Sequence, residues 1–170
     1  MTLATKVAEL HKNIHILSCS TKGKGNAIKH AVPFIRFNDV ILQDADMEYS
    51  ISDTTKMAIN HLDGNFDMSI GIREPFLLLK SKYTNNLIKA LLFFRFGKTL
   101  PDILTGSRIV KTYLLRKCNS SKFGLETELS KIALRDNLKI QLSRCSYLPR
   151  IIGKKIKAYH LTEIICKAIT

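Results

Sequence analysis

Short apolar runs alternate with segments of helical periodicity in the first half of the chain, and no other feature limits the fold as much. Residues 40–42 and 66–72 have the length and composition of buried strands, and residues 52–62 between them have the apolar spacing of a helix. Strands joined through helices are typical of a mostly parallel sheet, in which ligands bind beyond the carboxyl ends of the strands. The alternation therefore predicts an α/β fold with its functional site at that edge.

The remaining segments continue this pattern. Apolar spacing predicts further strands over residues 14–19 and 139–147, and helices over residues 3–10, 27–32, 83–96, 103–115, 125–134 and 159–169. The chain has 170 residues, of which 45% are hydrophobic, and this is enough to bury a core without disulfides or metal ions. We therefore expect residues 1–170 to form a single domain.

Cysteine spacing and apolar runs indicate the compartment. The four cysteines are far apart and show no CxxC spacing, which argues against a zinc site and against a disulfide framework. The longest apolar run is far shorter than the roughly 20 residues of a membrane-spanning helix, and the amino terminus lacks the apolar core of a signal peptide. Free thiols are typical of a reducing compartment, so we expect a cytoplasmic protein.

Positive charge is the strongest compositional feature, with a formal net charge of +13. Soluble domains this basic usually bind polyanions, such as nucleic acids, anionic lipid head groups or phosphorylated substrates. A solvated, lysine-rich surface without a ligand explains the composition equally well. The placement of the charged residues has to decide among these classes.

Three acidic residues, Asp44, Asp46 and Glu48, directly follow the apolar run of residues 40–42. Alternate residues of an extended segment point the same way, so the three carboxylates can converge on one point. Such oxygen ligands suit Mg²⁺ or Mn²⁺, which share their coordination with a substrate's phosphates. Acidic pairs at strand ends are often only helix caps or solvated loops. In a chain this basic, however, the segment predicts a metal site that binds a diphosphate.

Five segments in a fixed order resemble family 2 glycosyltransferases, specifically dolichyl-phosphate mannosyltransferase and bacterial polyprenyl-phosphate glycosyltransferases. The resemblance covers nearly the whole chain and implies a GT-A, Rossmann-like fold, a mostly parallel sheet flanked by helices. It also implies transfer of a hexose from a nucleoside-diphosphate sugar to a polyprenyl phosphate. The segments are KGKGNA (22–27), LQDADMEY (42–49), IGIR (70–73), PDILTGSR (101–108), and FGLETEL (123–129) followed by YLPR (147–150) and GKKI (153–156).

The chain also departs from the family pattern. The family begins with a strand carrying Pro-x-x-Asn-Glu and a second strand ending in paired aspartates, which together hold the base and ribose, and neither motif is present. The resemblance therefore implies a fold that lacks the first two strands of the family. Ile72 stands where the family usually has Ser or Thr, and Leu125 where it favours an aromatic residue. A non-catalytic remnant is thus one alternative.

The resemblance assigns roles to individual residues. Asp46 becomes the main ligand of Mg²⁺ or Mn²⁺, Glu48 its helper, and Asp44 a contact to the ribose or the metal. The ion would neutralise charge on the leaving diphosphate. The acceptor phosphate is already ionised near neutral pH, so it needs a cationic clamp more than a base. Basic side chains suit this clamp, and the candidates are Arg73, Arg108, Arg150, Lys154 and Lys155.

Three further acids are candidate catalytic residues, and each has a structural alternative. Asp102 is a candidate for orienting the acceptor or the sugar, but sequence alone favours it as the N-cap of a helix over residues 103–115. Glu126 and Glu128 also suit the first turn of the helix over residues 125–134, where acidic groups interact favourably with the helix dipole.

The competing class is a basic nucleic-acid-binding module. Against it stand the absence of tryptophan, the lack of aromatics interleaved with the basic clusters, and acids that repel phosphates unless they hold a metal. We therefore expect a nucleoside-diphosphate sugar and a polyprenyl phosphate as partners, and no nucleic acid. Residues 83–96 and 154–157 also suit an anionic membrane surface, which implies peripheral contact at the cytoplasmic membrane face.

Overall fold

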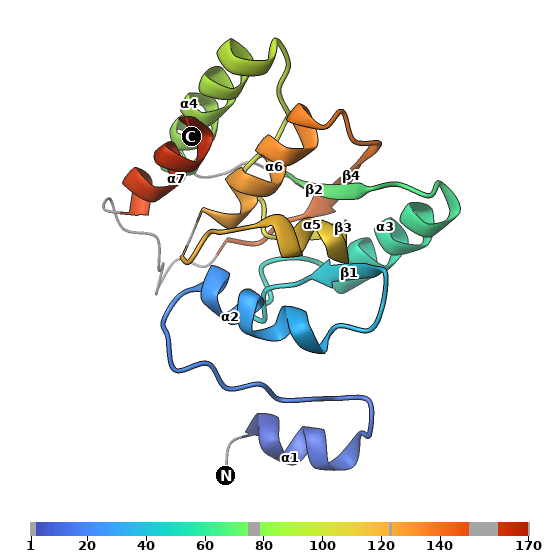
Figure 1. The fold of residues 1–170 in the computed structure, drawn as a ribbon. Helices are drawn as coiled ribbons and strands as arrows, with labels where there is room; N and C mark the ends of the chain where they lie inside the picture. Colours follow the sequence, from blue (N-terminus) through green and yellow to red (C-terminus); the bar gives the residue numbers. More distant parts are fainter. Residues whose placement is uncertain (1–2, 75–78, 123, 150–159, 170) are drawn as a thin grey trace.

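A computed structural model describes residues 3–74, 79–122, 124–149 and 160–169 (Figure 1). The strands are β1 (Asp39–Leu42), β2 (Met68–Glu74), β3 (Arg108–Lys111) and β4 (Ile140–Ser146). The α-helices are α1 (Leu3–Leu10), α2 (Lys24–Ala31), α3 (Ile51–Asp63), α4 (Leu79–Phe96), α5 (Thr112–Lys117), α6 (Leu125–Arg135) and α7 (His160–Ile169), and η1 (Val32–Phe34) is a 3-10 turn. Across these ranges, no helix combines the length and the apolar character needed to cross a bilayer.

The sheet is mixed, so the expectation of a mostly parallel sheet was wrong for the part of the chain that the structure describes. The strand order is β1-β3-β2-β4, and β3 runs antiparallel to both β1 and β2, while β2 and β4 are parallel. The cause lies in residues 103–115, which were predicted to be one helix but form a loop, β3 and α5. Most of their apolar side chains are buried, so hydrophobic spacing did not separate a helix from a strand followed by a short helix.

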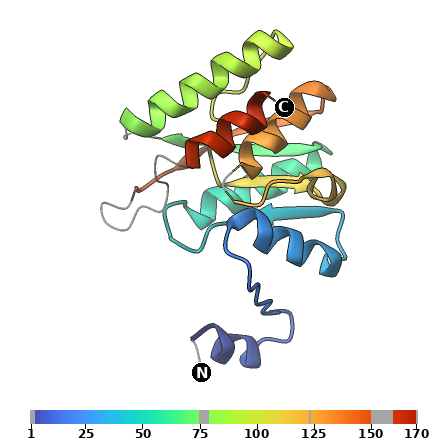
Figure 2. The ribbon, with the colours of Figure 1, turned by 60° about the vertical axis from the view of Figure 1, so that its left-hand side comes forward.

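Residues 14–19 do not form the predicted strand. They belong to no ladder among the described residues, and Ile14, Ile16 and Leu17 are 40–49% exposed. A strand is stabilised by hydrogen bonds to a neighbouring strand, and apolar composition does not supply that neighbour. Figure 2 shows α1 and this segment standing away from the rest of the molecule. Apart from residues 14–19 and 103–115, the expected strands and helices are confirmed within the described residues, with ends shifted by a few residues.

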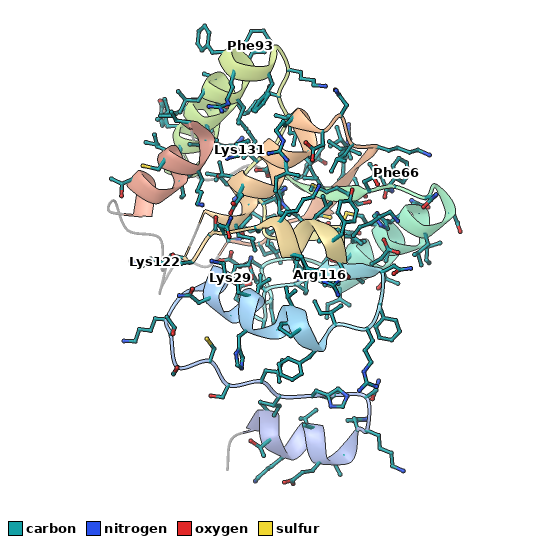
Figure 3. All side chains as sticks on the ribbon, in the orientation of Figure 1. Lys29, Phe66, Phe93, Arg116, Lys122 and Lys131 are labelled. Atoms are coloured by element: carbon teal, nitrogen blue, oxygen red, sulfur yellow. The ribbon has the colours of Figure 1, made fainter. Side chains whose placement is uncertain are left out.

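The core lies between the sheet and a layer of helices. Met68 and Ile70 of β2 are fully buried on the face covered by α4, α6 and α7. Ser69 lies between them, and its side chain points to the opposite face, where it contacts α3. This alternation follows from the two-residue period of a strand. Side chains fill the space between the helices and the sheet (Figure 3), and the core also includes Ile88, Leu92, Ile103, Val110, Leu114, Leu125, Leu129 and Ile164.

A buried network of hydrogen bonds connects α3 to β1, β2 and β4. His61 is 1% exposed; its Nδ1 lies 2.7 Å from Oγ of Ser69, and its Nε2 lies 3.1 Å from a carboxylate oxygen of Asp39. Ser69 donates a hydrogen bond of 2.6 Å to the side chain of Gln141 on β4. Buried polar groups with partners of this kind fix one arrangement of the elements, because any shift would leave a group unsatisfied.

Candidate functional site

The candidate site lies beyond one edge of the sheet. Leu42 ends β1 opposite Arg108, the first residue of β3, and Ile70 of β2 is paired with both Arg108 and Leu142 of β4. Beyond this row, the chain leaves β1, β2 and β4 toward their carboxyl ends and enters β3 at its amino end. The segments that gather beyond the edge are residues 43–49, 71–74, 101–107 and 143–147.

The three acids after β1 do not converge as their spacing predicted. Ala45 and Asp46 lie in a turn, and Met47 has a left-handed φ of 60°, so alternate side chains do not point the same way. Asp46 accepts a hydrogen bond of 3.2 Å from the amide of Glu48, and Glu48 accepts one of 3.0 Å from the hydroxyl of Tyr147. Asp44 faces away from this pair toward α2. The extended conformation assumed from the sequence is therefore replaced by a turn.

Lys24 joins Asp44 to Glu126 across the site. Its ammonium is 2.9 Å from a carboxylate oxygen of Asp44 and 2.8 Å from one of Glu126. Burial alone would lower the pKa of Lys24, but the two carboxylates outweigh it and raise the pKa above its ordinary value. Gly106 packs directly on this group, since a Cβ there would lie 2.4 Å from a carboxylate oxygen of Asp44. The site thus contains a fixed cation that was not among the predicted site residues.

Two glycines place Lys24 at this position. A Cβ on Gly25 would lie 2.3 Å from the carbonyl oxygen of Ser120, and one on Gly23 would lie 2.4 Å from that of Ser121. Gly23 also has a φ of 124°, which other residues rarely adopt. The amide of Gly25 donates to Lys122, so the first turn of α2 is bonded to protein carbonyls. The Gly-Lys-Gly segment therefore serves close backbone packing.

Glu128 supports the loop that packs on these glycines. Its carboxylate accepts hydrogen bonds from the amides of Asn119 and Ser120 at 3.0 and 2.7 Å and from the Ser120 hydroxyl at 2.6 Å. Burial raises the pKa of Glu128, but these hydrogen bonds outweigh it and the pKa falls below its ordinary value. Glu128 was predicted as a catalytic candidate; in this structure its carboxylate orders residues 119–120.

Arg73 and Asp102 form a buried ion pair at the same edge. Two nitrogens of the Arg73 guanidinium contact the two carboxylate oxygens of Asp102 at 2.7 and 2.8 Å, and both side chains are less than 10% exposed. The interpretation of Asp102 as a helix N-cap was wrong, because no helix begins after it. The charge of Arg73, a candidate phosphate ligand, is balanced by Asp102 in this structure.

Tyr49 and Tyr147 lie between the acidic segment 44–48 and the Arg73–Asp102 pair. Their rings lie 5.2 Å apart, and the Arg73 guanidinium lies 5.4 Å from the ring centre of Tyr147. The hydroxyl of Tyr49 accepts a hydrogen bond of 3.0 Å from the amide of Gly106. Burial and the neighbouring carboxylate of Glu48 raise the pKa of Tyr147, so its hydroxyl stays protonated. Sequence reasoning gave neither tyrosine a role in the site, although Tyr49 and Tyr147 each lie within a segment that carries the family resemblance.

Arg108 is fully buried beneath the loop that leads into β3. Its guanidinium donates to the carbonyl oxygens of Ile103 and Thr105, at 2.5 and 3.2 Å, and to the hydroxyl of Ser130 at 3.0 Å. Burial lowers its pKa, and backbone carbonyls take up the hydrogen-bonding capacity that a phosphate would need. In this conformation Arg108 shapes the 103–107 loop. The remaining clamp candidates, Arg150, Lys154 and Lys155, lie outside the described residues.

The acids at this edge suit a cation shared with a substrate better than one enclosed by protein. Among the described residues, no group of three or more Asp, Glu, His or Cys side chains is arranged to hold a metal ion. Asp46 is partly exposed on its turn, whereas Asp44 is balanced by Lys24. One or two carboxylates, with water and substrate phosphates completing the shell, is the usual environment of Mg²⁺. The assignment of such an ion to Asp46 stays a prediction.

Comparison with known proteins supports the sequence-based resemblance. No protein-family model matches the chain. Over 147 residues it is 29% identical to Glycosyltransferase AglJ from Haloferax volcanii, with 82% of this chain and 48% of AglJ covered. The chain is glycosyltransferase-like. It spans about half the length of this curated relative.

Solved structures show the same fold. Glucosyl-3-phosphoglycerate synthase from Mycobacterium tuberculosis in complex with UDP matches with a TM-score of 0.69 and 12% identity, covering 99% of this chain and 64% of that one. The same enzyme with Mn²⁺, UDP-glucose and phosphoglyceric acid matches with a TM-score of 0.66 and 15% identity, covering 88% and 55%. The glycosyltransferase-like chain therefore has a GT-A-like fold, built here on a mixed sheet.

Proposed function

We propose that the protein is a family 2 glycosyltransferase that transfers a hexose from a nucleoside-diphosphate sugar to a polyprenyl phosphate. The observation that carries the proposal is the place of the acidic segment 44–48: it lies at the sheet edge that also holds Lys24, Glu126 and the Arg73–Asp102 pair. The relation to Glycosyltransferase AglJ supports the reaction class. The Mn²⁺ and UDP-glucose in the synthase structure support the choice of donor and cofactor.

The donor half of the reaction would use the turn after β1. Asp46, helped by Glu48, would hold Mg²⁺ or Mn²⁺, which when bound neutralises charge on the leaving diphosphate. Lys24 fixes the Asp44 carboxylate, which is then oriented to accept a hydrogen bond from a ribose or sugar hydroxyl. Glu126 shares the same ammonium and therefore acts through Lys24 rather than as a separate base.

The acceptor half needs positive charge more than it needs proton transfer. The bond between the anomeric carbon and the diphosphate oxygen breaks as a bond to an acceptor phosphate oxygen forms, and no proton has to be removed from an ionised phosphate. Asp102 would hold Arg73 at the acceptor side, where its guanidinium faces Tyr147. Arg150, Lys154 and Lys155 are proposed to complete the phosphate clamp and to contact the membrane surface that carries the lipid.

A binding and transfer experiment tests this function. We expect uridine or guanosine diphosphate hexoses to bind in Mn²⁺ and not in chelator, and we expect Asp46→Asn to abolish that difference. Asp63→Asn, an exposed carboxylate at the end of α3, is the matched control and should bind as the unaltered protein does. Hexose should then appear on added polyprenyl phosphate. Donor binding that is independent of both metal and Asp46 would refute the proposal.

A further inference from the structure

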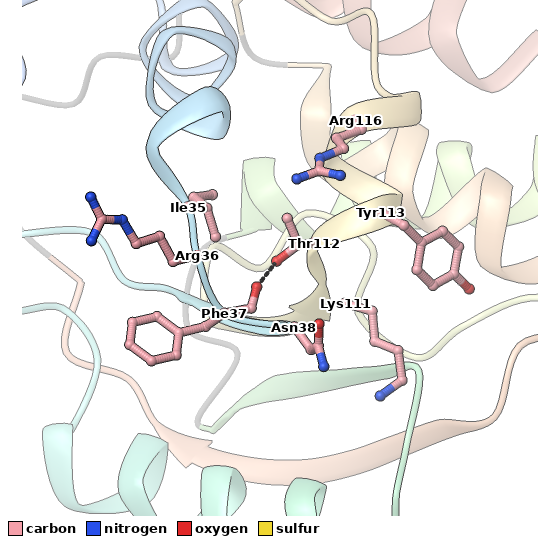
Figure 4. A pocket seen from close by; sticks show the side chains of 8 residues that line it. All are labelled: Ile35, Arg36, Phe37, Asn38, Lys111, Thr112, Tyr113 and Arg116. Atoms are coloured by element: carbon pink, nitrogen blue, oxygen red, sulfur yellow. Dashed lines mark hydrogen bonds between the residues drawn. The ribbon is translucent and has the colours of Figure 1, made fainter.

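A second recess lies at the other end of β1 from the acidic segment. It is an open pocket of about 290 Å³, lined by residues that precede β1 and follow β3 (Figure 4). Asp39 at the start of β1 is paired with Lys111 at the end of β3, whereas Asp44 lies beyond the other end of β1. The pocket and the proposed donor site are therefore separated by the length of a strand. The residues that line the pocket are Ile35, Arg36, Phe37, Asn38, Lys111, Thr112, Tyr113 and Arg116.

The floor of the pocket is fixed by a buried threonine. The hydroxyl of Thr112 donates to the carbonyl of Phe37 at 2.6 Å, and its amide donates to the carbonyl of Asn38 at 2.7 Å. These two bonds, of which Figure 4 draws the one to Phe37, hold the loop before β1 against the start of α5. The walls are thus already in place before any ligand arrives, which reduces the entropy that binding must overcome.

Three cations line this pocket, and two of them are not neutralised. Lys111 lies 3.3 Å from the carboxylate of Asp39. Arg36 and Arg116 are exposed and form no ion pair with any other residue that the structure describes. In Figure 4 their guanidinium groups project on either side of Ile35. Two uncompensated guanidinium groups around one recess are suited to a phosphate, whose oxygens accept their hydrogen bonds.

An aromatic ring stands beside these charges. Phe37 is 79% exposed, so its ring is accessible to a ligand. Tyr113, on the other side, already has the ammonium of Lys117 5.1 Å from its ring centre. Phe37 directly follows Arg36 in the chain, and in Figure 4 its ring projects from the same side of the pocket as the Arg36 side chain. An exposed ring next to guanidinium groups can stack on a flat ring whose phosphate is held by those groups.

We propose that this pocket binds a phosphate ester of nucleotide size, with its phosphate held by Arg36 and Arg116 and its ring stacked on Phe37. The proposal does not depend on the transfer reaction, because it uses none of the residues at the acidic edge and needs no metal. The pocket gives the chain a second place for an organic phosphate, which a product or a cellular nucleotide can occupy.

Titration calorimetry with AMP and with inorganic phosphate, in buffer containing chelator, tests the proposal. The double variant Arg36→Ala/Arg116→Ala should lose AMP affinity by at least about tenfold, since it loses two charge-assisted contacts. The control Lys12→Ala/Lys56→Ala removes the same charge from exposed positions elsewhere and should bind as the unaltered protein does. Phe37→Ala should weaken AMP while leaving inorganic phosphate unchanged. Because chelator removes the metal, failure of the donor site would not affect this result.

Three outcomes would overturn the inference. The first is equal AMP affinity in the two double variants, which would make the attraction a property of overall charge. The second is the absence of AMP binding at millimolar concentration. The third is much tighter binding of a single-stranded oligonucleotide that also depends on Arg36 and Arg116 and falls steeply with salt, which would assign the surface to nucleic acid. Thermal denaturation of each variant checks that the fold is retained, which is expected for exposed side chains.

Discussion

Removal of the Asp102 carboxylate should be among the most destabilising single changes in this protein. Asp102 is fully buried and accepts hydrogen bonds from the Arg73 amide and two guanidinium nitrogens at 3.4, 2.7 and 2.8 Å. Asp102→Ala would leave a guanidinium that is 7% exposed without the carboxylate that balances its charge. Breaking one side of a buried pair costs about 3–5 kcal/mol. We expect the free energy of unfolding to fall by that amount in urea denaturation followed by circular dichroism.

A surface pair provides the comparison. Arg135 and Asp136 have the same chemistry, with 2.6 Å between Nε and a carboxylate oxygen, but the arginine side chain is 54% exposed. Asp136→Ala should therefore cost less than about 1 kcal/mol. Replacing both buried charges, in Arg73→Met/Asp102→Leu, should be less destabilising than Asp102→Ala alone, because no charge is left behind. Equal costs for Asp102→Ala and Asp136→Ala would refute the reasoning from burial.

Three further predictions follow from the structure. Lys24→Met should weaken donor binding more than Lys24→Arg, because only the arginine keeps a cation between Asp44 and Glu126, and titration calorimetry with a nucleotide sugar measures the difference. The pKa of Glu128 is lower in the folded state than in the unfolded state. Its contribution to stability is therefore complete above the unfolded pKa of about 4.3 and is lost as the pH falls through the folded value. Glu128→Gln should reduce the loss of unfolding free energy at acid pH. Gly25→Ala should reduce the thermal midpoint more than Gly97→Ala, because the added Cβ meets backbone only at Gly25, although Gly97 has a φ of 68°.

Hydrophobic spacing predicted most elements but not the relative directions of the strands. The segments that became α3, α6 and β4 were recognisable because each has one long, uninterrupted period. Residues 103–115 were not, because β3 and α5 are only four and six residues long, and two short buried elements look like one helix. The exposed segment 14–19 shows the opposite error, in which strand-like composition lacks a neighbour with which to pair.

The site was predictable where local sequence determines it. The position of Asp44–Glu48 after β1 followed from the strand alone. The convergence of the acids did not, because a left-handed residue, Met47, turns the chain. Lys24, Tyr49 and Tyr147 lie in segments that carry the resemblance, but their roles were not predicted because they depend on contacts between distant segments, which one-dimensional spacing does not contain. Whether Asp46 binds metal remains a prediction.

Lys24 pairs with Asp44, 20 residues away in the chain, and with Glu126, about a hundred residues away. Contacts of such long range form late in folding, because the entropy of closing the intervening loop must be overcome first. A partly folded or proteolytically clipped molecule would retain β1 and α3 while Lys24 still lacked Glu126 and the 120–122 loop that fixes its position. Donor affinity would therefore report on completed folding of the second half of the chain. After dilution from denaturant, donor affinity should recover later than the helical circular dichroism signal.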